Sequence, residues 1–224
     1  MIVLPDSTLK SIPPALNARL SRHFAAGAVV ALAAVVASAT SATAAIIYVG
    51  TGLNIPSTTA GVYLNVVTGV SGPTPASVPG WDLNAWSATN LLFYANNAAS
   101  PNDGIVVGLG SSLTQADNLP TGSLIDGTYV YGRTPSSETT GATAFTLNSS
   151  NNLVGFRFLN ETTTTINYGW MRLAVGVTLG AQPRSIMEYA YENSGAGIQA
   201  GVVPEPATWS LLGAVALIGR RRRH

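Results

Sequence analysis

The sequence predicts a mainly β protein, an antiparallel β-sandwich of a jelly-roll-like or related kind, flanked by an N-terminal signal helix and a C-terminal transmembrane helix. Three observations predict it. Gly, Pro, Asn, Ser and Thr divide residues 45–201 into short apolar or alternating runs. No long stretch of this middle section has the helical period of 3.6 residues. Each end of the chain instead carries an uninterrupted apolar segment beside basic residues. We therefore divide the chain into residues 1–44, 45–201 and 202–224.

The runs between the turn residues give the individual strands. We expect strands at residues 46–49, 62–67, 91–94, 105–109, 128–131, 144–147, 153–159, 166–175 and 185–192. Alternation assigns faces: Val154, Phe156 and Phe158 share one side of their strand. In residues 185–192 the same rule places Met187 on one face with Tyr189 and Tyr191, and Ile186 on the other. Arg157 and Arg172 are expected to pair with Glu188 or Glu192 across neighbouring strands.

The N-terminal segment has the three parts of a secretory signal. Basic residues between Lys10 and His23 precede an apolar run over residues 24–37, and a run of small residues ends in Ala42-Thr43-Ala44. The small residues Ala42 and Ala44 mark the predicted cleavage site, with cleavage after Ala44 or Ala45. A retained N-terminal anchor is the alternative.

The C-terminal segment predicts a membrane tail. Pro204, Glu205 and Pro206 precede an apolar run over residues 207–219 with Trp209 near its outer edge, and four arginines follow: Arg220, Arg221, Arg222 and Arg223. Indole rings favour the membrane interface and arginines hold a chain end in the cytoplasm, so the body is expected outside the membrane. A plain membrane anchor without processing has the same topology.

The motif Pro204-Glu205-Pro206, the apolar run and the terminal arginines together resemble the PEP-CTERM sorting signal of exopolysaccharide-producing Gram-negative bacteria. The strand sequences in residues 153–201, such as Gly155-Phe156-Arg157-Phe158 and Tyr168-Gly169-Trp170, also resemble the final strands of that family. The resemblance implies recognition by an exosortase, a membrane enzyme thought to cut near Pro-Glu-Pro. The protein would be anchored in the inner membrane facing the periplasm, and then reach the cell surface or extracellular matrix.

Composition excludes several classes of function. Charged residues make up 9% of the chain, far below the roughly 25% of soluble domains. The middle section holds four arginines and eight carboxylates, a formal charge of −4. Nucleic-acid binding needs clustered cations, so no nucleic-acid partner is expected. The middle section also lacks His, Lys and Cys, which excludes Ser–His–Asp, Cys–His and Schiff-base chemistry and imidazole-bound metals.

Carboxylate chemistry and carbohydrate binding remain. Glu188 and Glu192 lie ~13 Å apart along one strand, beyond the ~5–9.5 Å of a glycosidase pair, although pairs across strands stay open. Trp81, Trp86 and Tyr94 are candidate sugar-stacking residues, with core packing as the alternative. Six oxygen-bearing side chains are candidate Ca²⁺ ligands, but their spacing matches no calcium loop and we favour turns for them: Asp82, Asn84, Asn96, Asn97, Asn102 and Asp103.

The sequence thus predicts a non-enzymatic exported protein of the cell surface or biofilm matrix, with an exosortase, the inner membrane and exopolysaccharide as partners. We expect no cofactor and no metal. A carbohydrate-binding module is the alternative, and a carboxylate-based glycan hydrolase is the third hypothesis.

Overall fold

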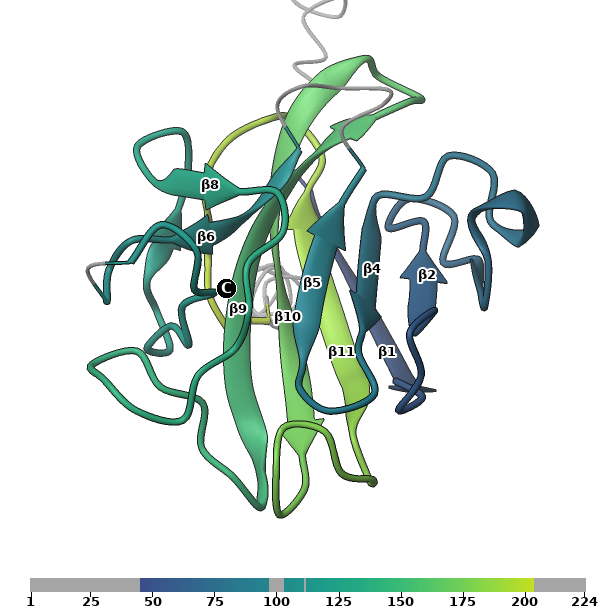
Figure 1. The fold of residues 1–224 in the computed structure, drawn as a ribbon. Coiled ribbons are helices and arrows are strands. Elements are labelled where there is room, and N and C mark those ends of the chain that lie inside the picture. The colour runs from purple at the N-terminus through teal and green to yellow at the C-terminus, as the bar shows by residue number, and fades with distance from the viewer. Residues whose placement is uncertain (1–44, 97–102, 111, 204–224) are drawn as a thin grey trace, which may run out of the picture. The chain divides into compact units, whose positions relative to one another are not determined.

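Two antiparallel sheets make up most of the structure, a computed structural model that describes residues 45–96, 103–110 and 112–203 (Figure 1). The chain divides into two units, Met1–Thr43 and Ala44–His224, and all described residues belong to the second. The expected mainly β, antiparallel class is confirmed. The expected signal helix (1–44) and transmembrane helix (202–224) lie outside the described residues, apart from the first two residues of the latter range.

The larger sheet has six strands in the order β1–β11–β10–β9–β6–β8. The bounds of its strands are β1 (Ile46–Asn54), β6 (Gly104–Val107), β8 (Val130–Gly132), β9 (Ser149–Asn160), β10 (Thr165–Val175) and β11 (Ser185–Glu192). The long hairpin of β9 and β10 runs through its centre, joined by the turn after Asn160. Asn160 holds this turn because its Oδ1 accepts from the backbone N–H groups of Thr162 and Thr163.

The smaller sheet has four strands in the order β3–β2–β4–β5, and a third pair, β7 with β12, stands apart. The bounds of these strands are β2 (Val62–Leu64), β3 (Ser71–Gly72), β4 (Leu83–Trp86), β5 (Leu92–Ala95), β7 (Leu124–Ile125) and β12 (Ile198–Gln199). One 3₁₀ turn, η1 (Pro75–Ser77), begins at Thr74, whose hydroxyl accepts from the N–H of Ser77.

The main hydrophobic core lies between the two sheets, which face each other in Figure 1. Leu64, Leu83 and Phe93 come from the smaller sheet, and Phe156 and Met171 come from the larger one. Burial of such side chains is the main force that holds two sheets together, at about 25 cal/mol per Å² of apolar surface removed from water. The inner faces of both sheets therefore form one core.

A second, smaller core covers the opposite face of the larger sheet. Trp170 is fully buried there beneath Ile125 and Ile198, which come from the β7–β12 pair, and beside Leu119. Trp170 and Met171 are neighbours in β10 and enter different cores, as the period of two in a strand requires. Both faces of the larger sheet are consequently buried at its centre.

The predicted faces are confirmed for β9, where Val154, Phe156 and Phe158 all enter the main core. For β11 the prediction is wrong. Ile186 is in the main core with Tyr189 and Tyr191, while Met187 is 40% exposed. The register explains the difference: Arg172 pairs with Glu188, and the next residue of β10 already pairs with Ile186. Met187 is therefore the extra residue of a β-bulge, which reverses the alternation on one side of it.

Two further predictions differ from the structure. Residues 144–147 form no strand, because the side chain of Asn152 satisfies the backbone of Thr146 in place of a neighbouring strand, at 2.7 and 3.0 Å. Strand β4 was not expected, because Asp82 just before it and Asn84 within it are residue types that are typical of turns. Trp81 contacts Tyr63 and Tyr94 on either side of Asn84 in the sheet, and Asn84 is buried.

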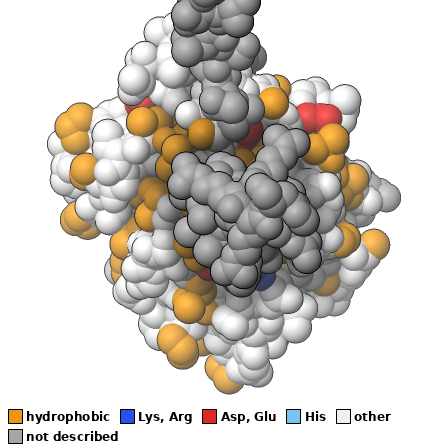
Figure 2. All heavy atoms as spheres, turned by 180° about the vertical axis from the view of Figure 1, so that it is seen from behind, with side chains coloured by type: hydrophobic (Ala, Val, Ile, Leu, Met, Phe, Trp, Pro, Cys, Tyr) orange, Lys and Arg blue, Asp and Glu red, His pale blue; other side chains and the backbone are white. Residues whose placement is uncertain are grey.

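The described surface carries few charges. Figure 2 shows mainly hydrophobic and uncharged side chains over the face seen from behind, in keeping with the low charged fraction of the sequence. The loops are held by uncharged hydrogen bonds: Asn65 accepts from the N–H of Thr68 and donates to the carbonyls of Pro79 and Gly80. Charge pairing consequently contributes little to the stability of the described chain.

The side chain of Arg184 connects the two sheets at one end. It is fully buried, and all five of its N–H groups donate to backbone carbonyls. These carbonyls belong to Ile55 (3.1 Å), Pro56 (2.8 Å), Leu179 (2.9 Å), Ser87 and Asn90. Within the described part of the chain no carboxylate pairs with Arg184. The segment after β1, the β4–β5 turn and the β10–β11 loop are thereby joined through one guanidinium group.

Replacement of Arg184 by Lys tests this connection. A lysine ammonium has three donors at one point, so it leaves some of the five buried carbonyls unpaired, and each buried unpaired group costs about 1–3 kcal/mol. We expect R184K to lower the free energy of unfolding by about 3 kcal/mol or more, measured by chemical denaturation. The control R133K changes an exposed arginine and is expected to unfold like the wild type. Equal unfolding of the two variants would contradict the structural role of Arg184.

Candidate functional site

The sorting residues predicted from the sequence lie outside the described residues. This applies to Pro204, Glu205, Pro206 and Trp209, to the cleavage residues Ala42 and Ala44, and to the arginines at 220–223. The described part of the chain contains no helix long and apolar enough to cross a membrane. The residues just before the motif are described: Val202 and Val203 follow β12 and are 37% and 41% exposed.

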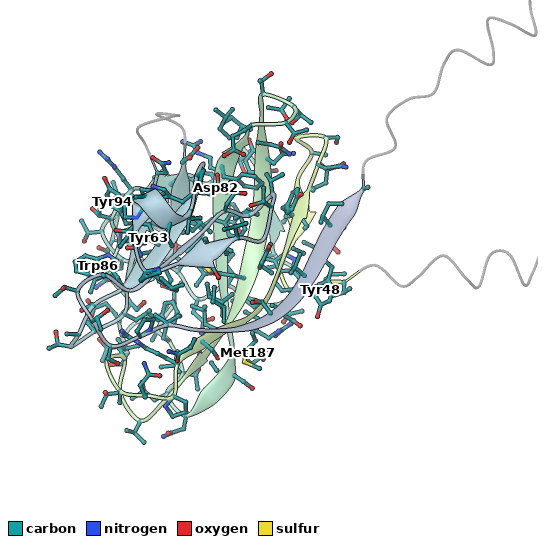
Figure 3. All side chains as sticks on the ribbon, turned by 90° about the vertical axis from the view of Figure 1, so that its right-hand side faces the viewer. Tyr48, Tyr63, Asp82, Trp86, Tyr94 and Met187 are labelled. Atoms are coloured by element: carbon teal, nitrogen blue, oxygen red, sulfur yellow. The ribbon has the colours of Figure 1, made fainter. Side chains whose placement is uncertain are left out.

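Three aromatic side chains form a row on the outer face of the smaller sheet. Tyr63 on β2 and Tyr94 on β5 both pair with Asn84 on β4, so the two tyrosines flank this asparagine on one face. Trp81, just before β4, contacts both tyrosines. We call Tyr63, Trp81 and Tyr94 the aromatic row. Figure 3 shows Tyr63 and Tyr94 on the same side of the sheet, directed away from the larger sheet.

The rings of the aromatic row pack against one another. Trp81 stacks on Tyr94 with ring centroids 5.6 Å apart, and meets Tyr63 edge to face at 4.9 Å. The guanidinium of Arg133 lies 4.9 Å from the centroid of Tyr94 and donates to its hydroxyl group. All three rings are half-buried. Aromatic pairs of this geometry contribute about 0.5–1.5 kcal/mol beyond their buried area, so the row stabilises the sheet while it remains accessible to solvent.

Trp86 is separate from the aromatic row. It lies on the same strand as Asn84, two residues further on, and makes no ring contact among the described side chains. Its Cβ packs over Gly61, where an added Cβ would lie 2.3 Å from the Cβ of Trp86; this contact and the φ of +65° exclude any larger residue at position 61. Of the three predicted sugar-stacking residues, the structure brings together Trp81 and Tyr94 and leaves Trp86 apart.

The candidate Ca²⁺ ligands serve the fold where they are described. The carboxylate of Asp82 accepts from the backbone N–H of Val66 at 2.7 Å, and Asn84 donates to the carbonyl of Ala60 at 2.9 Å. Asn96 donates to the carbonyl of Trp81, and Asp103 accepts from the N–H of Leu159. Asn97 and Asn102 lie outside the described residues, and the described ones contain no cluster of three acidic, His or Cys side chains suited to a metal.

The two glutamates of β11 are engaged in different ways. Glu188 forms an ion pair with Arg172 at 2.7 Å and accepts from the hydroxyl of Tyr48 at 2.6 Å, which confirms the predicted pairing of Arg172. These two donors lower the pKa of Glu188 against the opposing effect of desolvation, the largest single influence. Glu192 is buried, and its carboxylate accepts from the N–H groups of Ser194 and Ala196.

Arg157 pairs with no glutamate of the described residues. Its guanidinium lies 4.4 Å from the ring centroid of Tyr131, a cation–π contact.

The sequence did not predict that Tyr63 and Arg133 belong to the outer face of the smaller sheet with Trp81 and Tyr94. The alternation of Val62, Tyr63 and Leu64 places Tyr63 on the solvent side and was the available signal. No sequence signal places Arg133, because it follows β8 and reaches Tyr94 only through the fold.

Comparison with protein-family models, with curated proteins and with solved structures finds no match to this chain.

Asp82 gives the region beneath the aromatic row a testable pH dependence. Its side chain is 2% exposed, and desolvation raises its pKa to about 8, against the effect of the hydrogen bond from Val66. In the unfolded chain an aspartate titrates near pH 4. Because the folded pKa is the higher one, the protonated form stabilises the fold. This contribution is fully present below about pH 4, declines as the pH rises, and is lost once the pH passes about 8.

We therefore expect D82N to unfold at a nearly constant temperature between pH 5 and pH 9, while the wild type loses stability over this range relative to the variant. Thermal unfolding followed by circular dichroism at several pH values measures the difference. E138Q changes a carboxylate that is not among the groups that shift the pKa of Asp82, and it serves as the control. A wild type and D82N that respond to pH in parallel would show that Asp82 is ionised in the folded protein.

Proposed function

We propose that this chain is an exported, non-enzymatic protein of the cell surface or extracellular matrix that is sorted by an exosortase through its C-terminal segment. The observation that carries the proposal is the order of features in the sequence. A secretory signal pattern begins the chain, and Pro204-Glu205-Pro206, an apolar run and four arginines end it. Each feature alone is a weak signal, whereas the combination describes a protein with both a route of export and a membrane tail.

The geometry next to the motif supports the proposal. Val202 and Val203 are exposed, and the N–H of Val202 closes a turn on the carbonyl of Gln199 at 3.3 Å. A processing enzyme needs an exposed segment that it can hold in an extended form. The body in front of the motif is anchored separately, because Ile198 and Ala200 are buried in the second core. Cleavage after residue 203 would therefore leave the body of the protein intact.

The surface composition of the body supports the proposal that the protein lies in a polysaccharide matrix. Described loops are rich in Ser, Thr and Asn, and few charges are present to attract oppositely charged proteins. The proposed partners are the exosortase, the inner membrane as a transient anchor, and exopolysaccharide. The same proposal assigns the two-sheet body to the β-sandwiches related to jelly rolls, a class in which extracellular and lectin domains are frequent.

Carbohydrate binding is the second candidate function of the body. The half-buried aromatic row favours it, because rings on a solvent-facing sheet present apolar surface to a sugar. The exposed guanidinium of Arg133 lies beside the ring of Tyr94 and supplies polar groups. Since Arg133 and Trp81 both pack against Tyr94, a sugar would contact mainly Tyr63 and the exposed parts of Trp81.

Substitution of all three motif residues tests the sorting proposal. In the native host we expect the wild-type protein to be released as a species that begins near Ala45 and ends near Pro204, as measured by intact mass. A variant with Pro204, Glu205 and Pro206 all changed to Ala is expected to remain in the membrane fraction with its tail. The wild type in a strain without the sorting enzyme should behave like the variant. Release of the variant with the wild-type mass would contradict the proposal.

A second experiment tests carbohydrate binding by the aromatic row. We expect W81A to lose retention on the exopolysaccharide of the host, because the central ring of the row is removed, with an affinity reduced by about tenfold or more. The matched control is W86A, which removes a tryptophan of the same sheet outside the row. Circular dichroism of both variants verifies the fold. Equal retention of W81A and the wild type would exclude the row as a sugar site.

A further inference from the structure

The outer edge of β1 differs from the other sheet edges of the described chain. β1 is the end strand of the larger sheet and has nine residues. The opposite end of that sheet, β8, has three residues, and β3 in the smaller sheet has two. The other edge of the smaller sheet, β5, is covered, because Phe93 and Ala95 donate to the carbonyls of Pro135 and Arg133, and β7 and β12 have two residues each. β1 is therefore the long uncovered edge in the described structure.

The sequence of β1 lacks the usual protection of an edge strand. Natural edges are protected by lysine, proline, inward-pointing charges or bulges. The strand Ile46–Asn54 has no charged residue and no proline. Its bulge lies between Gly50 and Leu53, which leaves residues 46–50 as a regular segment. Ile47 and Tyr48 in this segment are 36% and 43% exposed. Figure 3 shows β1 at the outside of the sheet, with no described strand beyond it.

The hydrogen-bond pattern shows which residues face the open edge. Asn193 donates its backbone N–H to the carbonyl of Ala45, so residue 45 is hydrogen-bonded to the β11 side. Antiparallel pairing alternates along the strand. Residues 47 and 49 therefore also bond to β11, and Ile46, Tyr48 and Gly50 direct their N–H and C=O groups outward. The side chain of Tyr48 leaves this edge open, because its hydroxyl reaches across the sheet to Glu188 at 2.6 Å.

We propose that β1 pairs with β1 of a second copy of this chain, antiparallel and about a two-fold axis at Tyr48. This register places Ile46 opposite Gly50 of the second copy, a large residue opposite one without a side chain. It also places Ile47 opposite Val49, and such β-branched cross-strand pairs stabilise sheets. The outward-facing backbone groups of residues 46, 48 and 50 are satisfied in the same register. The two six-stranded sheets then continue as one.

A second copy fits this edge better than an unrelated partner. A charged partner finds no opposite charge on residues 46–50, and like copies of an uncharged strand do not repel each other. Ile47, exposed in the single chain, is covered by Val49 of the second copy in this register. The inference concerns residues 46–50 alone and does not depend on the proposed export and sorting.

Cysteine cross-linking tests the register, since the chain has no natural cysteine. Cα atoms of opposite residues in a hydrogen-bonded pair are ~5.5 Å apart, within the range of a disulfide. We expect the full-length Y48C variant, purified in mild detergent, to form a disulfide-linked dimer upon mild oxidation. T51C is the matched control, because its two copies lie ~20 Å apart in this register. Equal cross-linking of both variants, or none at position 48, would overturn the proposal.

Sedimentation tests the association without cross-linking. We expect the full-length wild type to be a dimer. I47K should raise the dissociation constant of this dimer by about tenfold or more, because the two-fold axis repeats the Ile47–Val49 contact and the lysine removes both copies of it. V177K introduces the same residue at an exposed position in the β10–β11 loop and should leave the dimer unchanged. Thermal unfolding verifies that I47K is folded. A wild type that sediments as a monomer, or an I47K variant that dimerises like the wild type, would refute the pairing.

Discussion

The arrangement of the two sheets depends on a guanidinium group that is buried with no counter-ion among the described residues. A buried cation is tolerated only when its donors are all satisfied, and Arg184 meets this condition with backbone carbonyls alone. Five carbonyls from three separate segments must therefore stay in place around one side chain. Ser87, which supplies one of them, has a φ of 106°, a conformation that non-glycine residues rarely adopt. The turn between β4 and β5 thus takes a shape that suits Arg184.

Elsewhere in the body, hydrogen bonds between uncharged groups hold loops and turns in place. Buried Asn65, Asn152 and Asn160 each bind backbone groups of a neighbouring loop or turn. The chain has no cysteine, and its described part contains a single ion pair, so side-chain amides hold the loops in place of disulfides and salt-bridge networks. Bonds between neutral groups are hardly screened by salt. This construction suits a protein that meets changing ionic strength, as the proposed place outside the cell requires.

The sequence predicted the parts of the fold that depend on alternation. The central strands β9 and β10 follow it up to the register shift after Leu173, and the two faces can be derived from the parity of residues such as Phe156 and Trp170. It could not predict the bulge at Met187, because a bulge depends on the pairing with β10. Nor could it predict that Trp81 contacts Tyr63 on β2, since that contact joins residues of different strands. Trp86 and Tyr94 both follow the strand pattern, yet only Tyr94 joins the row.

The features with proposed roles lie on different sides of the two-sheet body, and this separation follows from the packing. β12 and Ala200 belong to the side of the larger sheet where Trp170 is buried. The aromatic row lies on the outer face of the other sheet, with the main core between them. The open edge of β1 lies at the side, where neither face covers it. Since none of the three described surfaces overlaps another, the proposed roles do not compete for the same residues.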